Sequence, residues 1–531
     1  MTSRPDGQPP RFSILTPVFN PPIAAFEECI ASVFDQTLDE WEWCIADDAS
    51  TEPHVDELLR QIERDPRVHV VRRAANGGIV SASNAAAEIA SGEFVCLLDH
   101  DDALAAAALE SISHAIWLDP LADYLYSDED KVDEHGNFYD RFWKPAWSPE
   151  RLRGQNYCSH LSVIRRSLFD EVGGFRDGFD GSQDYDLVLR VTERCRSVAH
   201  IPEVLYHWRA IQGSTASDFD AKPAAFDAAF RALQDHIDRV GIAGSVERVE
   251  SGYYRVRRHL VHEPLVSIVM PTRGSSKPIW GIDTCLPTNA IRSIVEHSTY
   301  SNYEVVVVHD SDTPEHELDS MAQLLGDRLT LVEYAKDFNF AEKTNLGAVN
   351  SSGDVVVMLN DDTQVISPDW IETLLGYLVE PDVGMVGPML LLGDQRVQSA
   401  GHYNKLTPYH LGAGALPSDG GPFGLFSIAC ERTGVTAACA ALRREVYDEI
   451  GGLSMSFPRS FNDVDLAFKL LERGFRIIWT PFARLYHFES LSRDPNVTPK
   501  EVEDLYDRWG TMMENEPYSR GIDQWWTSMP L

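Results

Sequence analysis

The sequence predicts an α/β protein with two tandem domains, each built around a mainly parallel β-sheet. Its 531 residues are enough for about two to four domains of ~100–200 residues each. Short apolar strands alternate with helices, which is typical of a parallel sheet covered by helices on both faces. A series of motifs occurs twice in the same order, and this indicates a duplicated domain.

The internal repeat consists of matched motifs whose spacing changes only in small steps. Residues 12–17 match residues 266–271 with an offset of 254, and Tyr206-His207 matches Tyr486-His487 with an offset of 280. The matched pairs between them are 43–48 with 305–310, 84–92 with 345–353, 98–102 with 359–363, 173–175 with 451–453 and 183–187 with 462–466. Two copies of one domain, differing by loop-sized insertions, explain this constant order.

The first copy reads as strand, helix, strand, helix and strand. The predicted strands are 13–18, 43–46 and 93–98, and the predicted helices are 24–35 and 81–89. In sheets of this kind, ligands bind beyond the carboxyl ends of the strands. Asp48 and the acidic residues 99–102 fall at such ends, so we expect them to line a site.

Domain boundaries follow from composition and from the repeat. We expect a disordered tail at 1–10, a first domain at 11–250, a linker at 251–264, a second domain at 265–515 and a C-terminal tail at 516–531. The linker contains the basic run 255–259, and a helical stretch at 224–240 precedes it.

The chain is strongly acidic. It has 46 Lys+Arg against 82 Asp+Glu, which gives a formal net charge of −36. Non-specific nucleic-acid binding and electrostatic docking on anionic lipid both need a basic surface, so the composition argues against both. A local basic pocket stays compatible with this charge, as do phosphate ligands whose charge is met by a metal held between carboxylates.

Neither the cysteines nor the termini indicate export. The eight cysteines form no C-x-x-C pair, so no zinc knuckle or redox motif is expected. Residues 1–11 are polar and rich in Pro and Gly, without the apolar core of a secretory signal. No run approaches the ~18 apolar residues of a membrane helix. We therefore expect a cytoplasmic protein.

An acidic cluster follows the strand at 93–98. Asp99, Asp101 and Asp102 would stand together at one strand end, where like charges raise one another's pKa values. A divalent ion such as Mg²⁺ or Mn²⁺ relieves this repulsion and can also bind substrate phosphates. The alternative is an Asp-rich solvated turn or helix cap.

A carboxylate and an imidazole recur further along each copy. Asp184 and His207 are separated by 23 residues, and Asp463 and His487 by 24. Either histidine alone would read as an ordinary core or surface residue. Because the pair stays in step in two diverged copies, we interpret these residues as parts of a site.

These motifs together resemble family 2 glycosyltransferases of the GT-A fold. The resemblance covers about residues 11 to 510. The first half resembles that of tandem bacterial enzymes for O-antigen and related polysaccharides, and the second half is similar to rhamnosyltransferases. Its motifs in the first half are 98–102, 126–131, 154–157, 181–186 and 206–209, and in the second half 338–340, 359–362, 435–439, 461–465 and 485–490.

The resemblance implies roles for residues of the first copy. Pro17 and Asp48 would line the nucleotide pocket, with Asp48 near the base. Asp99 and Asp101 would be the D-x-D pair that holds the metal and the diphosphate, with His207 as a later ligand. Asp184 would be the general base, and we expect the carboxylate of Asp186 two residues on to raise its pKa.

The second copy would have the same roles, with one departure. Pro271, Asp310 and Asp361 would contact the nucleotide sugar. Asp362, His487 and Asn360 would bind the metal, and Asp463 would be the base, with Asp465 placed as Asp186 is. Asn360 stands where Asp99 does, and its amide oxygen can ligate Mg²⁺ but brings one negative charge fewer. Weaker metal binding or a different donor is one reading of this change.

The implied reaction is an inverting, metal-dependent transfer of a hexosyl or rhamnosyl group from a UDP-, dTDP- or GDP-sugar. The acceptor would be a glycan or a lipid-linked glycan. The Q-x-x-R-W motif and membrane channel of processive synthases are missing from the sequence. Trp525-Trp526 could contact the inner face of the plasma membrane or pack on the chain's own domain.

Two other readings stay open. Only the first domain could be catalytic, with the second holding the acceptor or acting as a scaffold. The chain could also be a glycan- or nucleotide-binding protein without transfer activity. A nucleotidyltransferase is disfavoured, because residues 17–22 are not a Gly-rich phosphate loop.

Overall fold

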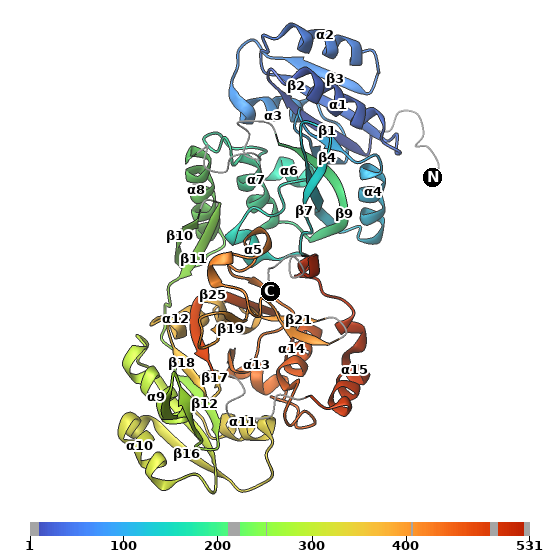
Figure 1. Ribbon diagram of the computed structural model, residues 1–531. Helices are drawn as coiled ribbons and strands as arrows, with labels where there is room; N and C mark the ends of the chain where they lie inside the picture. Colours follow the sequence, from blue (N-terminus) through green and yellow to red (C-terminus); the bar gives the residue numbers. More distant parts are fainter. Residues whose placement is uncertain (1–9, 211–222, 251, 405–406, 489–496, 525–531) are drawn as a thin grey trace. The chain divides into compact units, whose positions relative to one another are not determined.

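The computed structural model describes residues 10–210, 223–250, 252–404, 407–488 and 497–524 (Figure 1). Most of the tail predicted to be disordered and the Trp525-Trp526 pair lie outside these residues. The chain divides into two compact units. The first holds residues up to 147 with 155–242 and 248–254, and the second holds 148–154, 243–247 and 255 onwards. The predicted boundaries stay a prediction, but residues 148–154 pack within the second unit.

The first unit is built on one large sheet with the strand order β3-β2-β1-β4-β8-β6-β9-β5, and β7 pairs with β6. The parallel pairs β3-β2, β2-β1 and β1-β4 form its first half, and the second half is mixed. The strands are β1 (Phe12–Val18), β2 (Trp41–Asp47), β3 (Val68–Arg72), β4 (Phe94–Leu97), β5 (Ala103–Leu104), β6 (Ala122–Val132), β7 (Phe138–Phe142), β8 (Ser162–Arg165) and β9 (Ser197–Arg209). The helices are α1 (Ile23–Phe34), α2 (Pro53–Ile62), α3 (Gly78–Glu88), α4 (Ala108–Leu118), α6 (Arg166–Glu171), α7 (Gln183–Thr192) and α8 (Pro223–Arg239).

The second unit repeats this order as β16-β15-β12-β17-β24-β19-β25-β18. The strands of its sheet are β12 (Val266–Thr272), β15 (Tyr303–Asp310), β16 (Leu329–Tyr334), β17 (Val355–Leu359), β18 (Thr363–Val365), β19 (Val383–Leu391), β20 (Val397–Ser399), β23 (Cys430–Glu431), β24 (Cys439–Arg443) and β25 (Arg476–His487). The helices are α5 (Pro149–Gly154), α9 (Leu286–His297), α10 (Glu315–Leu325), α11 (Phe340–Val349), α12 (Trp370–Leu378), α13 (Arg444–Glu449), α14 (Asn462–Glu472) and α15 (Pro499–Met513). The prediction of an α/β chain with two tandem domains is confirmed.

In the described part of the chain, three hairpins lie outside the large sheets. They are β10 (Gly244–Glu250) with β11 (Tyr253–Arg258), β13 (Ser276–Ile279) with β14 (Ile282–Cys285), and β21 (His402–Asn404) with β22 (Pro408–His410). The first hairpin includes part of the linker predicted at 251–264, which stays a prediction. Residues 255–258 of the basic run lie in β11, where Arg255 and Arg257 pair with Glu247 and Arg258 pairs with Glu150.

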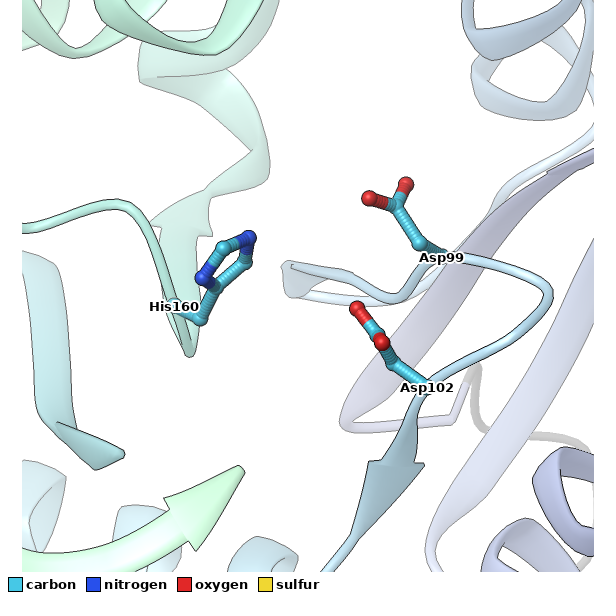
Figure 2. Close-up of side chains that lie close together, drawn as sticks. All are labelled: Asp99, Asp102 and His160. Carbon is cyan, nitrogen blue, oxygen red and sulfur yellow. The ribbon is translucent and has the colours of Figure 1, made fainter. Parts of the chain in front are cut away.

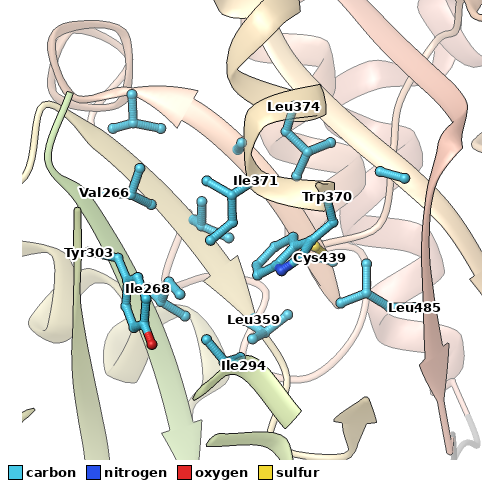
Figure 3. Close-up of a cluster of buried hydrophobic side chains, with 14 of the residues drawn as sticks. Val266, Ile268, Ile294, Tyr303, Leu359, Trp370, Ile371, Leu374, Cys439 and Leu485 are labelled. Atoms are coloured by element: carbon cyan, nitrogen blue, oxygen red, sulfur yellow. The ribbon is translucent and has the colours of Figure 1, made fainter. Parts of the chain in front are cut away.

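Burial on both faces explains why the central strands are continuously apolar. All five residues of β17 are buried, as expected for a parallel strand covered on both sides. On one face, Trp370 and Ile371 of α12 pack over Leu359, Cys439 and their neighbours (Figure 3). This packing fixes the end of β17, where the acidic turn begins.

A buried network of ion pairs joins α5 to the rest of the second unit. The Glu150 carboxylate accepts hydrogen bonds from Arg258 at 2.6 Å and from Arg153 at 3.0 Å. Glu380 pairs with both of these arginines and with Arg476. Burial alone would raise the pKa of Glu150, but the charge of Arg258 holds it below its ordinary value. The network therefore depends on every charge having its partner.

Among the described residues, none of the helices combines the length and the apolar character needed to cross a bilayer.

We predict that Arg258→Met lowers the free energy of unfolding of the second unit by about 3–5 kcal/mol, because Glu150 and Glu380 would keep buried charges without this partner. Urea unfolding of the full chain measures the effect. The double variant Arg258→Met with Glu150→Gln should recover part of the loss. A single variant as stable as the parent would contradict the prediction.

Candidate functional site

In the first unit, the predicted residues Pro17, Asp48 and Asp99 lie at or just beyond the carboxyl ends of β1, β2 and β4. Pro17 is near the end of β1, and its carbonyl oxygen lies 2.9 Å from Nδ1 of His100. Asp48 follows β2 and is 2% exposed. Its carboxylate accepts the backbone N–H groups of Gly77 and Gly78 at 3.0 and 2.9 Å. Asp48 therefore ties β2 to the start of α3, and Arg73 also pairs with it.

The turn after β4 brings two carboxylates together with an imidazole. One ligand atom each of Asp99, Asp102 and His160 lies within 4.8 Å of the others. Figure 2 shows both carboxylates on the turn, with His160 facing them from a separate loop. Burial raises the pKa of Asp99 and of Asp102, and the charge of Asp101 raises both further. Such a set of two oxygens and a nitrogen suits a divalent cation.

His160 is a site residue that sequence reasoning missed. It lies three residues after the motif 154–157, which carried part of the resemblance, and has no counterpart in the second copy's repeat. Its Nδ1 lies 3.2 Å from Oε2 of Glu129, so Nε2 is left for the carboxylates. That contact helps to raise the pKa of His160 above its ordinary value, although burial opposes it.

His207, the predicted late ligand, lies close in the sheet but has another partner. It pairs with Ala103 in the β5–β9 register, next to the acidic turn. Its Nδ1 is 2.6 Å from Oδ1 of Asp130. The close group among the described residues contains His160 instead. Asp101 is held through its backbone, since its carbonyl oxygen accepts Nε–H of Arg209 at 2.9 Å.

Asp184 is the second residue of α7 and is half-buried. Its Oδ2 accepts a hydrogen bond from Nδ2 of Asn156 at 2.9 Å. Partial burial raises its pKa. The expectation that Asp186 raises the pKa of Asp184 is wrong. The carboxylate of Asp186 pairs with Arg176 and Arg190, so its negative charge is compensated.

In the second unit, most of the predicted residues line one cavity of about 520 Å³. Its lining includes Pro271, Asn360, Asp361, Asp362, Asp463 and His487. Asp310 contacts the lining of the cavity through Lys343, whose Nζ donates a hydrogen bond to its carboxylate at 2.7 Å. The fold thus brings residues from four separate parts of the chain to one place.

Thr272 connects two residues that line this cavity, Lys343 and Asp361. Its carbonyl oxygen accepts from Nζ of Lys343 at 2.6 Å, and its hydroxyl donates to Asp361 at 2.6 Å. Burial and the charge of Asp362 raise the pKa of Asp361 to about 7. Lys343 also lines the cavity, so a cationic group stands beside the acidic ones.

The donor set around His487 fits a metal ion. Nε2 of His487 lies 3.1 Å from Oδ1 of Asp362 and 3.1 Å from Nδ2 of Asn360. The side-chain amide oxygen Oδ1 of Asn360 is buried and has no hydrogen-bond partner among the described residues. An imidazole nitrogen, a carboxylate and an orphaned amide oxygen are all ligands for Mg²⁺ or Mn²⁺. The change from Asp99 to Asn360 therefore leaves a usable set of donors.

Asp463 holds the same helical position as Asp184 but has a different partner. Its Oδ2 lies 3.7 Å from Nε2 of His402, which comes from β21. Burial lowers the pKa of His402 to about 4, so the imidazole is neutral at pH 7. Burial opposes ionisation of Asp463, yet the nearby imidazoles keep its pKa below the ordinary value. Like Asp186, Asp465 is compensated, by Arg508 and by a hydrogen bond from Trp509.

The two acidic turns differ by one residue, which the motif match did not reveal. Ala103 pairs with His207, and Thr363 pairs with His487. Strand β5 begins five residues after Leu98, whereas β18 begins four residues after the matching Leu359. By strand register, Asp362 is therefore equivalent to Asp102, whereas the motif alone matched it to Asp101.

The family model described as "Glycosyl transferase family 2" matches residues 13–173 and 267–451, one segment in each copy and more than half of the chain. The uncharacterized protein y4gI of Sinorhizobium fredii is 39% identical over 522 residues, which cover 94% of this chain and 56% of that protein. The O-antigen biosynthesis protein RfbC of Myxococcus xanthus is 34% identical over 498 residues, which cover 92% of this chain and 38% of RfbC. The chain thus spans about half or less of these relatives.

Among solved structures, Staphylococcus aureus TarS in complex with UDP-GlcNAc has 20% sequence identity and a TM-score of 0.36. The likeness covers 43% of this chain and 66% of that one.

Proposed function

The chain belongs to glycosyl transferase family 2, and we propose from this that each unit transfers a sugar from a nucleotide-sugar donor to a glycan or lipid-linked glycan. The pathway we propose is the synthesis of a bacterial surface polysaccharide of the O-antigen type. The name of RfbC supports this pathway, as do the more distant matches to a chondroitin synthase and a hyaluronan synthase. The donor would be a UDP-, dTDP- or GDP-sugar carrying a hexosyl or rhamnosyl group.

One observation carries the proposal. In the second unit, a carboxylate at a helix start, Asp463, lines the same cavity as the metal-type donors Asp362 and His487. A glycosyl transfer needs both groups at one place, because the acceptor must lose a proton while the diphosphate leaves. A binding protein without transfer activity has no need for a base beside the donors.

The residues that would hold a divalent metal are Asp99, Asp102 and His160 in the first unit. Asn360, Asp362 and His487 would hold it in the second. When bound, Mg²⁺ or Mn²⁺ supplies positive charge that offsets the charge developing on the leaving nucleoside diphosphate. Asp101 and His207, which the resemblance favours as ligands, would then support the turn and the edge of the first site.

The bases would be Asp184 and Asp463. Each carboxylate takes the proton from an acceptor hydroxyl while that oxygen attacks the anomeric carbon. The bond from this carbon to the diphosphate breaks on the opposite side, so the configuration inverts. Asn156 donates a hydrogen bond to the Asp184 carboxylate. The neutral imidazole of His402 lies beside the carboxylate of Asp463.

A second candidate is that the first unit alone is catalytic. Asn360 is the observation that favours it, because the amide brings no charge to the metal. The complete set of a base, a carboxylate and an imidazole around one cavity supports two active units instead.

We predict that Asp184→Asn and Asp463→Asn each remove one of two transfers, with a rate loss of ~10²–10⁴-fold, because the amide cannot accept the acceptor's proton. Nucleoside diphosphate release is measured with UDP-, dTDP- and GDP-sugars and membrane glycolipid acceptors. NMR of the product gives the anomeric configuration.

The matched controls for these variants are Asp177→Asn and Asp448→Asn, which make the same change at exposed positions. Full activity of Asp463→Asn with every donor would leave the first unit as the only catalyst. Full activity of both single variants would overturn the assignment of the bases.

We also predict different acid limits for the two transfers. A base works only when it is deprotonated, so activity falls as pH drops through its pKa. Burial raises the pKa of Asp184, whereas the pKa of Asp463 is held below its ordinary value. The first transfer should therefore fail at a higher pH. The pH profile of kcat in Asp463→Asn reports the first unit, and that in Asp184→Asn reports the second. The reverse order would contradict the prediction.

A further inference from the structure

The two late histidines are held in the same way by residues that do not match in the repeat. In the first unit, Nδ1 of His207 lies 2.6 Å from Oδ1 of Asp130 on β6. In the second unit, Nδ1 of His487 lies 2.8 Å from Oε1 of Gln398 on β20. Both acceptors are 4% exposed or less. Both units therefore have a hydrogen-bond acceptor at Nδ1 of this histidine, but a different strand provides it in each.

The first unit draws its acceptors from one acidic run. Asp128, Glu129 and Asp130 are consecutive on β6, and they contact His200, His160 and His207 respectively. The strand β19 begins 261 residues after β6 and takes its place in the second sheet. By their pairing with β25, Met389 and Leu391 are equivalent to Asp128 and Glu129, and Leu392 follows where Asp130 stands; all three are apolar. The second unit therefore needs another source of support for His487.

A β-bulge supplies it. Leu390 pairs with Ser399, and Leu391 pairs with Val397, so Gln398 is the extra residue of β20. A bulge re-aims the side chain at its position, and here the side chain reaches His487. Strand β20 pairs with β19 as β7 pairs with β6, and the segment from β19 to β24 that contains it is where the repeat offset rises from 261 to 278.

Two contacts specify the same tautomer of His487. The amide oxygen of Gln398 can only accept, so Nδ1 carries the hydrogen. The amide nitrogen of Asn360 can only donate, so Nε2 presents its lone pair. That lone pair lies 3.1 Å from the Asp362 carboxylate, which is also an acceptor. Two facing acceptors repel each other unless a cation lies near both.

We propose that Gln398 is a positioning residue that makes Nε2 of His487 the metal-facing nitrogen of the second unit, through the same kind of Nδ1 contact that Asp130 makes with His207 in the first. This inference rests on the proposed function, since it places the metal in the proposed donor site. Hydrogen bonds to the far nitrogen of a ligating histidine fix its tautomer and ring orientation, and their loss typically costs 10–100-fold in metal affinity.

The test uses the full chain with ¹⁵N-labelled histidine, with the signals of His487 identified by their loss in His487→Gln. Gln398→Leu removes the acceptor, and Gln398→Glu restores one of the same kind as Asp130. Nitrogen shifts report the tautomer, and line broadening on addition of Mn²⁺ alone reports binding at this residue. Gln323→Leu, on the exposed face of α10, is the matched control.

We expect His487 of the parent chain to carry its hydrogen on Nδ1 and to be broadened by Mn²⁺. Gln398→Leu should raise the Mn²⁺ concentration needed for this broadening 10–100-fold and should mix the two tautomers of His487. Gln398→Glu should bind Mn²⁺ as tightly as the parent chain or more tightly. If Gln398→Leu does not fold, Gln398→Asn replaces it, because its shorter amide withdraws the oxygen from Nδ1.

The failures are distinguishable. If Mn²⁺ broadens His487 equally in the parent and in Gln398→Leu, with the same tautomer, the role of Gln398 is wrong and the metal site stands. If Mn²⁺ does not broaden His487 of the parent, and both of its nitrogens carry hydrogen, His487 is an imidazolium paired with Asp362. The metal site of the second unit is then wrong as well.

Discussion

Buried carboxylates at the carboxyl ends of parallel strands are the constraint on which both units depend. A parallel sheet directs the ends of β1, β2 and β4, or of β12, β15 and β17, to one edge, so the acidic turns meet there. Charges gathered in this way must each have a partner, because desolvation of an unpaired carboxylate is costly. Histidines, backbone N–H groups and a buried lysine meet that need, and the same groups outline the proposed site.

The duplication kept this arrangement but changed the residues that maintain it. Asp48 is held by backbone N–H groups at the start of α3, whereas its counterpart Asp310 is held by Lys343. Asn156 contacts one candidate base, and His402 contacts the other. These exchanges alter the charge and the protonation of each site while leaving the backbone order of the sheets unchanged. Two units of one fold can in this way favour different donors.

Segments between the matched motifs account for most of these differences. Strand β20, which takes the place of β7, and strand β21 of the β21–β22 hairpin bring Gln398 and His402 to the second site. Helix α5 lies within the sequence of the first copy but packs in the second unit, where Glu150 completes a network with Arg258 and Glu380. The order of motifs along the chain is therefore a guide to the sheets, and a poorer guide to which unit owns a connecting segment.

The sequence by itself determined the α/β class, the duplication and the strand and helix order, because hydrophobic periodicity and repeated motifs are local signals. It also predicted the acidic turns, Asp184, Asp463 and His487. Only the tertiary structure brought His160, Asp130, Gln398 and His402 to the sites, since their roles come from contacts between distant segments. The extra residue in the first acidic turn likewise emerged only from strand register. Pairing across the sheet joins segments that are far apart in the chain, so the register of β5 with β9 and of β18 with β25 is defined only when the whole unit has packed.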